Sequence, residues 1–229
     1  MVVMEYDEVV RRLEEMGDER ARKVWARLGM DTKNYFGVNL TKLKKFAKEV
    51  GKAHELASKL WASGIHDAQL LACYIEEPKK VTKEQIDSWI EDVDFMDLSD
   101  KFATEVVWKT PFAKEKMKAW TVHEKEYHKR AGYVLLGKFA QKGKDDEISE
   151  EELLGYLDRI EKELQGERNW VREVMNYALI HIGSRSPKLN ERGIEIAKRI
   201  GKVEIDWGEA DCKVPDAVED LTNIKLKLI

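Results

Sequence analysis

Residues 39–51 read NLTKLKKFAKEVG, and this stretch decides which kind of fold the chain adopts. Its apolar residues recur at the 3.6-residue spacing of one helix face, at Leu40, Leu43, Phe46, Ala47 and Val50. Gly51 follows the last apolar position and is suited to end a helix. The stretch therefore predicts an amphipathic helix that buries one stripe against its neighbours.

The same pattern continues along nearly the whole chain. Helical segments follow one another from EYDEVVRRLEEMG (5–17) to LNERGIEIAKRIG (189–201). Alternating strand-like patterns are scarce, and KVEIDW (202–207) is the one short candidate. We therefore expect an all-α protein in which each helix buries its stripe on other helices.

The expected helices also recur at a regular interval. Four helix starts fall near residues 40, 82, 124 and 167, a spacing of roughly 42 residues that lies in the range of HEAT-type helical pairs. This spacing predicts a right-handed α-solenoid of HEAT-like helical pairs, whose concave face is open to a partner. We expect one domain over residues 1–229, with helical repeats over 1–200 and a capping tail over 201–229.

Composition limits the class of protein. The chain has 229 residues, of which 43% are hydrophobic and 37% are charged. No run approaches the roughly 18 apolar residues of a membrane span, and the N-terminus becomes charged too early for a signal peptide. Cys73 and Cys212 lie far apart and alone, which argues against a disulfide framework, a cysteine metal site or a cysteine nucleophile. We expect a soluble, cytoplasmic monomer that does not contact membranes.

The distribution of charge is more informative than the net charge of −4. Residues 109–142 hold nine basic and three acidic residues, and residues 183–202 hold six and two. Acidic residues gather instead in 84–105, 145–163 and 203–220. Such segregation can build a basic surface on an acidic protein, as contact with phosphates requires, although amphipathic helices also segregate charge by chance.

Two histidines resemble a zinc-protease motif but have the wrong spacing. In that motif the histidines are four residues apart and share one helix face. In HEKEYH (123–128), His123 and His128 are five residues apart, which is about 140° around a helix. We expect no metal site here.

The stretch EYHKRAGYVLLGKFA (126–140) predicts a buried stripe with cations beside it. Lys129 and Arg130 project from the flank of this stripe, next to the small residues Ala131 and Gly132. An arginine in this setting can pack on a neighbouring carboxylate, or it can clamp a phosphate with its planar fork. The residues themselves leave both uses open.

The stretch DFMDLSDKF (94–102) places an aspartate at every third position among apolar residues. Asp94, Asp97 and Asp100 can form an ordinary amphipathic edge, or one of them can lie in a cleft and take part in chemistry. Composition does not separate the three.

Four stretches together resemble the DNA alkylation repair family of HEAT-like-repeat glycosylases, the AlkD type. In chain order they are KNYFGVNLTKLKKFAK, DFMDLSDKF, EKEYHKRAGYVLLGKFA with the tryptophan before it, and NWVREVMNYALIHIG. The resemblance runs over residues 10–200, and the tail is similar to one subgroup. It implies a stack of helical pairs that holds duplex DNA in a basic concavity and excises N3- and N7-alkylated purines without metal, cofactor or base flipping.

The resemblance also implies which carboxylate is catalytic. The family motif Trp-Asp-x-x-Asp aligns with MDLSD (96–100), so its catalytic aspartate carries over to Asp100. Breaking the glycosidic bond of a cationic purine builds positive charge on the sugar, which a fixed carboxylate stabilises while it orients a water. Asp94 is then expected to be solvated, and Asp97 to cap or orient the helix start.

The DNA contacts that the resemblance implies come from other positions. The family arginine that grips the backbone carries over to Arg130, and we expect Lys129 and Arg172 to contact DNA as well. The two aromatic residues that flank the damaged nucleotide correspond to Tyr177 and Met96. Met96 departs from the aromatic pattern.

Three functions follow from these observations. The first is a glycosylase for alkylated purines, with Asp100 as its carboxylate. The second is a non-catalytic protein that binds DNA structures on the same scaffold, and it is motivated by Met96. The third is an adaptor for another protein, which would show no DNA affinity even at low salt.

Overall fold

The computed structural model describes residues 4–143, 147–210 and 212–224. Within these ranges the chain forms thirteen α-helices and no strand, which confirms the all-α prediction. Residues 202–207, the one strand candidate, form neither helix nor strand. No described helix is both long and apolar enough to cross a membrane.

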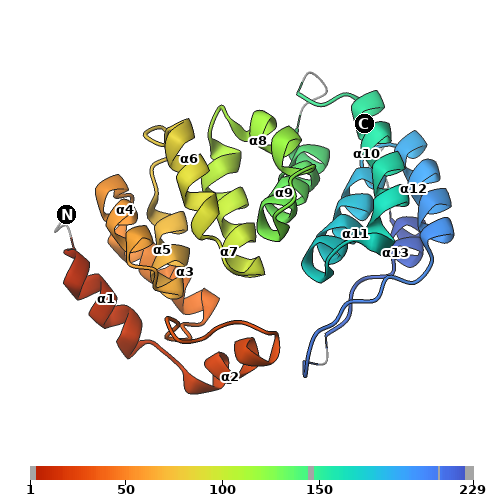
Figure 1. Ribbon diagram of the computed structural model, residues 1–229. Coiled ribbons are helices and arrows are strands. Elements are labelled where there is room, and N and C mark those ends of the chain that lie inside the picture. The colour runs from red at the N-terminus through yellow and green to blue at the C-terminus, as the bar shows by residue number, and fades with distance from the viewer. Residues whose placement is uncertain (1–3, 144–146, 211, 225–229) are drawn as a thin grey trace. The chain divides into compact units, whose positions relative to one another are not determined.

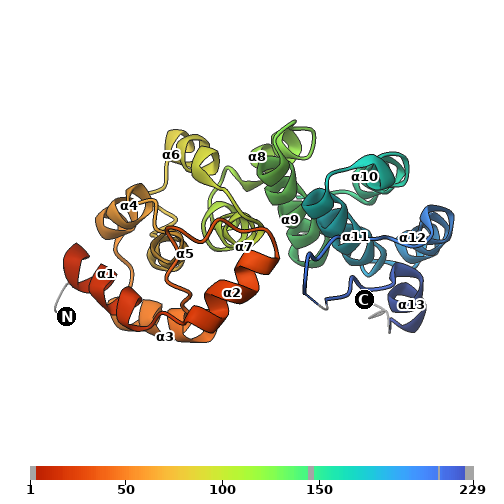
Figure 2. The same cartoon turned by 60° about the horizontal axis from the view of Figure 1, so that its bottom comes forward.

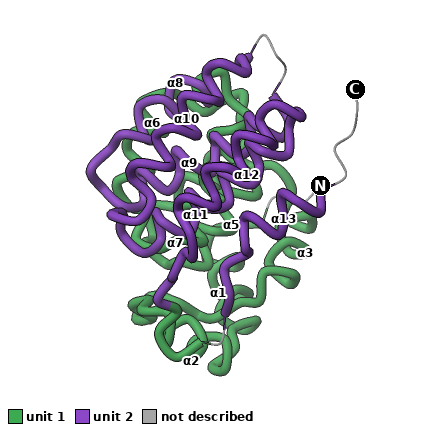
Figure 3. Tube along the Cα trace, turned by 90° about the vertical axis from the view of Figure 1, so that its right-hand side faces the viewer, with its two compact units in different colours: residues 1–112, 207–211 green, residues 113–206, 212–229 purple. Residues whose placement is uncertain are grey.

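The chain divides into two compact units, which Figure 3 shows in different colours. Unit 1 contains residues 1–112 and 207–211, and unit 2 contains residues 113–206 and 212–229. The expected tail is therefore shared, because residues 207–211 belong to unit 1 while the rest belongs to unit 2. That residues 1–229 act as a single domain stays a prediction.

Unit 1 is built around helix α5. Its helices, labelled in Figure 1, are α1 (Tyr6–Glu15), α2 (Glu19–Arg27), α3 (Leu40–Val50), α4 (His54–Ala62), α5 (His66–Ile75), α6 (Lys83–Trp89) and α7 (Met96–Lys101), with the short turns η1 (Ile90–Asp92), η2 (Phe102–Val106) and η3 (Val107–Lys109). Helix α5 packs against α3, α4 and α7, and Figure 2 shows it surrounded by these three helices. Because α5 has neighbours on several sides, almost all of its residues are buried.

Helix α3 begins and ends as the quoted stretch predicts. The Asn39 side chain accepts a hydrogen bond from the Thr41 N–H at 2.8 Å, which satisfies one of the free donors of the first turn. Gly51 ends the helix with a φ of 78°, a left-handed value that favours glycine. Leu43, Phe46 and Ala47 are buried.

An aromatic cluster fills the middle of unit 1. The Trp61 and Trp89 rings stack with centroids 4.2 Å apart and an interplanar angle of 6°. The Phe102 ring lies 5.4 Å from Trp61 and 6.2 Å from Trp89. The Trp61 indole N–H donates to Asp92 at 2.9 Å, so the buried ring keeps its polar atom satisfied. This cluster joins α4 and α6 to η2, the turn that directly follows α7.

Unit 2 is built around the contact between two long helices. Its helices are α8 (Ala113–Trp120), α9 (Glu126–Lys142), α10 (Glu150–Glu163), α11 (Asn169–Gly183), α12 (Pro187–Ile200) and α13 (Ala217–Asn223), with the short turn η4 (Leu164–Gly166). Helices α9 and α11 make the most extensive helix–helix contact in the described chain. Helix α8 covers α9, while α12 and α13 cover α11.

Gly132 allows α8 to approach α9 closely. A Cβ at this position would lie 2.5 Å from the Thr121 amide nitrogen and 2.7 Å from the Trp120 carbonyl carbon. Both atoms belong to backbone, which cannot move aside like a flexible side chain. The small residue noted in the sequence therefore serves helix packing within unit 2.

The helix starts are regular, but the helices are not equivalent repeats. Helices begin at Leu40, Lys83, Glu126 and Asn169, which are each 43 residues apart. Helices α9 and α11 pack on each other, whereas α6 contacts mainly its own continuation η1. The spacing therefore points to the right class of fold without marking four copies of one structural position.

Candidate nucleic-acid interface

The segment 94–102 places its three aspartates in three different environments. The Asp94 side chain is 66% exposed. Asp97 is buried in the first turn of α7, and Asp100 is half-buried in its last turn. The segment is therefore not a uniform solvated edge, and each aspartate needs its own explanation.

Asp97 is held by a buried histidine from α5. Its Oδ1 lies 3.0 Å from Nε2 of His66, and the same oxygen accepts the Leu98 N–H at 2.8 Å. On the other side of the ring, the Asp94 carboxylate lies 3.6 Å from Nδ1, which is an ion-pair distance but too long for a hydrogen bond. Asp97 thus orients the start of α7 and also joins that helix to α5.

His66 carries a positive charge at neutral pH. Burial lowers its pKa, but the charges of Asp97 and Asp94 and the hydrogen bond to Asp97 outweigh this effect and raise the pKa to about 9. The folded protein therefore contains a buried imidazolium between two carboxylates. This contact joins residues 31 positions apart, and no local sequence motif indicated it.

Asp100 lies where the helix changes its geometry. Its carbonyl oxygen accepts a hydrogen bond from the Thr104 hydroxyl at 2.7 Å. The next turn, η2, is π-helical and begins at Phe102. Such turns are rare and are frequently found at functional sites. Asp100 is half-buried, so its environment is compatible with the catalytic role that the resemblance implies, and that role stays a prediction.

Met96 is buried at the first position of α7, with 9% of its surface exposed. Little of its thioether therefore faces solvent. The resemblance implies an aromatic face beside the nucleotide at this position, but this chain has a methionine there whose side chain is mostly covered by other residues. Its contact with DNA stays a prediction.

Arg130 is buried rather than projecting from the flank of α9. It is 4% exposed, and its Nη1 donates to the Glu173 carboxylate at 2.5 Å and to the Trp170 carbonyl oxygen at 2.8 Å. Glu173 is itself buried, so the pair lies inside the contact between α9 and α11. Of the two uses left open by the sequence, the structure shows pairing with a carboxylate. A phosphate at this guanidinium would compete with Glu173.

Lys129 follows the same pattern at the edge of that contact. Its ammonium group pairs with the Glu167 carboxylate, and both side chains are 17% exposed. Nearby, the Glu126 carboxylate accepts the Trp170 N–H at 3.1 Å and satisfies a free donor in the first turn of α11. The cations and carboxylates at this end of α9 therefore connect it to the start of α11.

Arg172 and Tyr177 are the two predicted residues of unit 2 that lie on α11. Both are half-buried on α11. The Arg172 Nε is buried without a hydrogen-bond partner among the described residues. The Tyr177 ring lies 6.4 Å from the His181 ring, one helical turn away. These two side chains can offer a donor and an aromatic face, whereas Lys129 and Arg130 are engaged within the protein.

The predicted site residues are distributed over both units. Helix α7 of unit 1 carries Met96 and Asp100. Helices α9 and α11 of unit 2 carry Lys129, Arg130, Arg172 and Tyr177. Within each unit these residues lie on helices that are central to the packing.

The two basic segments of the sequence are largely neutralised by ion pairs. Lys118 lies 3.0 Å from Glu152, and Lys188 lies 2.9 Å from Glu150. Arg192 lies 2.8 Å from Asp158. Further pairs in these segments are Lys109–Glu105, Lys114–Glu152, Lys129–Glu167, Arg130–Glu173 and Arg199–Glu161. Their basic charge is therefore less available to phosphates than the charge sums suggest.

A basic surface that the charge sums missed lies on α3. We call it the lysine face, and it consists of Lys42, Lys44, Lys45 and Lys48. All four are exposed, and none has an ion-pair partner in the described part of the chain. The one acidic residue of α3, Glu49, pairs instead with Arg12 at 2.7 Å. The signal was present in the opening stretch, where each of these lysines lies outside the apolar stripe.

The two histidines of HEKEYH lie against each other. The His123 and His128 rings stack with centroids 4.2 Å apart and planes 13° apart. Ring nitrogens in two nearly parallel planes do not point at one common ion. Among the described residues, no group of three or more His, Cys, Asp or Glu side chains could hold a metal.

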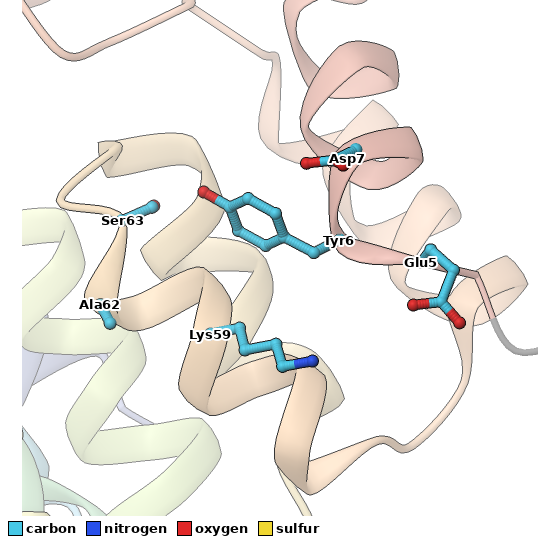
Figure 4. Close-up of a pocket in the computed structure, with 6 residues that line it drawn as sticks. All are labelled: Glu5, Tyr6, Asp7, Lys59, Ala62 and Ser63. Carbon is cyan, nitrogen blue, oxygen red and sulfur yellow. The ribbon is translucent and has the colours of Figure 1, made fainter.

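A shallow pocket in unit 1 has the wrong charge for phosphates. Figure 4 shows the Tyr6 ring pointing from α1 toward α4 at this site. The pocket is lined by Glu5, Tyr6, Asp7, Lys59, Ala62 and Ser63. Two carboxylates next to one ammonium group do not favour an anion. The lysine face is the better candidate for a nucleic-acid contact in this unit.

Comparison with known proteins gives consistent results. The uncharacterized protein Lin0241 of Listeria innocua is 30% identical over 219 residues, which cover 93% of this chain and 94% of that protein. The uncharacterized protein Lmo0209 of Listeria monocytogenes is 29% identical over 219 residues, with the same coverage.

A solved structure shares the fold over almost the full length. It is described as "a new family of proteins related to the HEAT-like repeat DNA glycosylases with affinity for branched DNA structures". The TM-score is 0.85 at 27% identity, and the match covers 96% of this chain and 93% of that one. This similarity confirms the HEAT-like fold class.

The family model described as DNA alkylation repair enzyme matches residues 9–202. This range includes α7, α9 and α11, the helices that carry all the predicted site residues. The chain therefore belongs to the DNA alkylation repair enzyme family.

Proposed function

We propose that this chain binds branched DNA through contacts with the phosphate backbone. The observation that carries the proposal is the solved structure with a TM-score of 0.85 and 27% identity, which belongs to proteins described as having affinity for branched DNA. At a branch point several duplex arms bring their phosphates together, so an exposed basic surface gains more contacts there than on one linear duplex.

The lysine face of α3 supports this proposal. Its four exposed lysines have no ion-pair partner among the described residues, so their charge is available to phosphates. Contacts of this kind fix a protein on DNA without reading its sequence. Binding to a DNA shape requires no more than that.

Two residues favour binding over base excision as the principal activity. Met96 is buried and supplies no aromatic face to a cationic sugar. Arg130, expected to grip the backbone beside the lesion, is paired with Glu173 inside unit 2. Of the two positions that support excision in the family, one thus lacks its aromatic residue and the other has its arginine paired within the protein.

The test is a binding competition with matched DNA. A labelled four-way junction is bound by the protein, and unlabelled junction or linear duplex of the same arm sequence is added at several salt concentrations. We expect the junction to compete at least about tenfold better, a difference of about 1.4 kcal/mol. Equal competition by the linear duplex would contradict the preference for branches, and absence of binding even at low salt would favour an adaptor.

Base excision at Asp100 is the second candidate, and it is favoured by the family match and by the half-buried carboxylate next to the π-helical turn. In that reaction the C1′–N bond of a cationic purine breaks, and the bonding electrons leave with the neutral base. A water oxygen then bonds to C1′ and loses its proton, while the Asp100 carboxylate stabilises the charge that develops on the sugar.

This candidate is tested with DNA that contains 7-methylguanine, by measuring the released base. If excision is real, Asp100→Asn should lower the rate by about 10²–10³, whereas Asp94→Asn, at an exposed position, should change it little. Release by wild type that Asp100→Asn leaves unchanged would remove Asp100 from this role. No release by wild type would leave DNA binding as the function.

A further inference from the structure

Two adjacent residues at the start of α5 hold the loop that leads into α3. The His66 backbone N–H donates to the Asn34 carbonyl oxygen at 2.8 Å. The buried Asp67 carboxylate accepts the Phe36 N–H at 2.6 Å and the Val38 N–H at 2.8 Å, one on each oxygen. Because Leu40 begins α3 directly after this loop, these bonds fix the point at which the lysine face starts.

His66 also holds α7, through its ring. The His66 ring bonds Asp97 through Nε2, and Asp94 lies across the ring at Nδ1. The Tyr35 ring covers the imidazole edge-on, with centroids 5.4 Å apart, and closes the site from the loop. Residues 66–67 thus contact the segment that precedes α3 and the segment that begins α7.

The charge state of His66 decides whether both carboxylates beside its ring, Asp94 and Asp97, face a proton. The titratable groups that face it are Asp94 and Asp97 at the start of α7, Asp67 on α5 itself and Tyr35 from the loop. With both ring nitrogens protonated, each can point a proton at a carboxylate. When one proton leaves, one of the two carboxylates faces a lone pair, and the buried Asp97 loses its positively charged partner even where the Nε2–H is kept.

We propose that His66 and Asp67 are positioning residues that hold the lysine face of α3 and the Asp100-bearing helix α7 to α5, so that loss of the His66 proton weakens DNA binding. The inference rests on the proposed function, because it assumes that the lysine face binds phosphates. In this inference His66 and Asp67 affect DNA binding without contacting DNA. Loss of the His66 proton acts on the lysine face, which does contact DNA.

The experiment measures the dissociation constant for a four-way junction between pH 7 and pH 9.5, at constant salt. Wild type is compared with His66→Gln and with a matched control, His54→Gln. His54 is the first residue of α4, as His66 is of α5, and its Nδ1 lies 2.7 Å from the buried Glu76. It therefore controls for loss of a histidine–carboxylate contact at a helix start that holds neither α3 nor α7.

We expect wild type and His54→Gln to weaken by the same factor, about tenfold, as pH rises through about 9. His66→Gln should bind about tenfold more weakly than wild type already at pH 7 and should change little with pH. A His66→Gln protein that matches wild type in affinity and pH profile would overturn the inference.

A second measurement needs no variant of the site and no DNA. The ring Cε1–H resonance of His66 is followed by NMR in the wild-type protein. The chain has five histidines, so the signal of His66 has to be distinguished from only four others. Titration near 9, accompanied by shifts in the amide signals of residues 34–38 and 96–98, supports the inference. Titration near 6.5, or no shifts in those amides, would refute it even where junction binding is confirmed.

Discussion

In each unit, a buried cation joins two of the described helices. In unit 1, His66 of α5 lies 3.0 Å from Asp97 of α7. In unit 2, Arg130 of α9 lies 2.5 Å from Glu173 of α11. Both cations are buried to a similar degree, with 3% and 4% of their surface exposed. The geometry is alike, but an arginine keeps its charge at all physiological pH values and a histidine does not.

The comparison teaches that a buried ion pair can join two helices in two ways. We call the Arg130–Glu173 pair a fixed joint, because its charges do not change with pH, and the His66–Asp97 pair a titratable joint. Unit 2 should hold α9 and α11 together over the whole pH range in which the protein is folded. Unit 1 should hold α5 and α7 together more strongly while His66 is protonated than after it has lost its proton. The exposed lysine face is a third case, because its cations have no partner within the described chain and remain available to other molecules.

The largest effect is expected from breaking the fixed joint. Arg130→Ala removes the guanidinium that faces the buried Glu173 carboxylate and should destabilise unit 2 by about 3–5 kcal/mol. Hydrogen exchange of amides in α9 and α11 measures this loss, while amides in α5 serve as an internal control. The double variant Arg130→Ala with Glu173→Ala should recover part of the loss. Unchanged exchange in the single variant would show that the pair contributes little.

The next effect comes from titrating the other joint. The pKa of His66 is raised from 6.5 to about 9, so its stabilisation is present in full below pH 6.5 and is lost as pH rises through 9. This linkage amounts to about 3 kcal/mol for unit 1. Hydrogen exchange at both ends of this range should show faster opening of α5 and α7 at high pH, after correction for intrinsic rates. Equal changes in α9 and α11 would contradict a local cause.

The lysine face should affect DNA affinity without affecting either joint. Replacing Lys42, Lys44, Lys45 and Lys48 with Gln should reduce the slope of log affinity against log salt by about 0.9 for each lost phosphate contact. The matched control replaces Lys59, Lys79, Lys162 and Lys198, which are also exposed and make no ion pair in the described chain. Because both variants change net charge equally, equal slopes would exclude a specific role for α3.

The smallest effect is expected from Lys129, which is neither a fully buried paired cation like Arg130 nor an exposed one like those of the lysine face. Its pair with Glu167 is partly buried, so Lys129→Gln should cost about 1 kcal/mol in stability or less. The salt dependence of junction binding should stay unchanged, since the ammonium group is already occupied. A slope reduced by about one would show that Lys129 leaves Glu167 to contact a phosphate, as the family resemblance implies.

The helices could be predicted because their signals are local. The stripe from Leu40 to Val50 and the stop at Gly51 correspond to α3 as observed, with Asn39 as its cap. Helix α10 begins at an equally local signal, because the side chain of its N-cap Ser149 accepts the Glu152 N–H at 3.1 Å. Such patterns depend on residues within one or two turns of each other, so a sequence displays them directly.

The candidate site could be predicted only in part because its contacts join distant residues. Arg130 and Glu173 are 43 positions apart, and neither position identifies the other. Charge sums over a window count every lysine equally, so they ranked residues 109–142 above α3. Whether a cation is available depends on which carboxylate folding brings to it. That is a property of tertiary packing and has no local signature.

The short segment 207–211 has a consequence for how the protein is made. The Glu209 N–H donates to the Arg27 carbonyl oxygen at 3.4 Å, and Gly208, with a φ of 57°, lies where a Cβ would come within 2.0 Å of that oxygen. A piece of unit 1 is thus encoded after nearly all of unit 2. During synthesis, the end of α2 stays uncovered until residues 207–211 have left the ribosome, so unit 1 begins folding first but is completed only after most of unit 2 has been made.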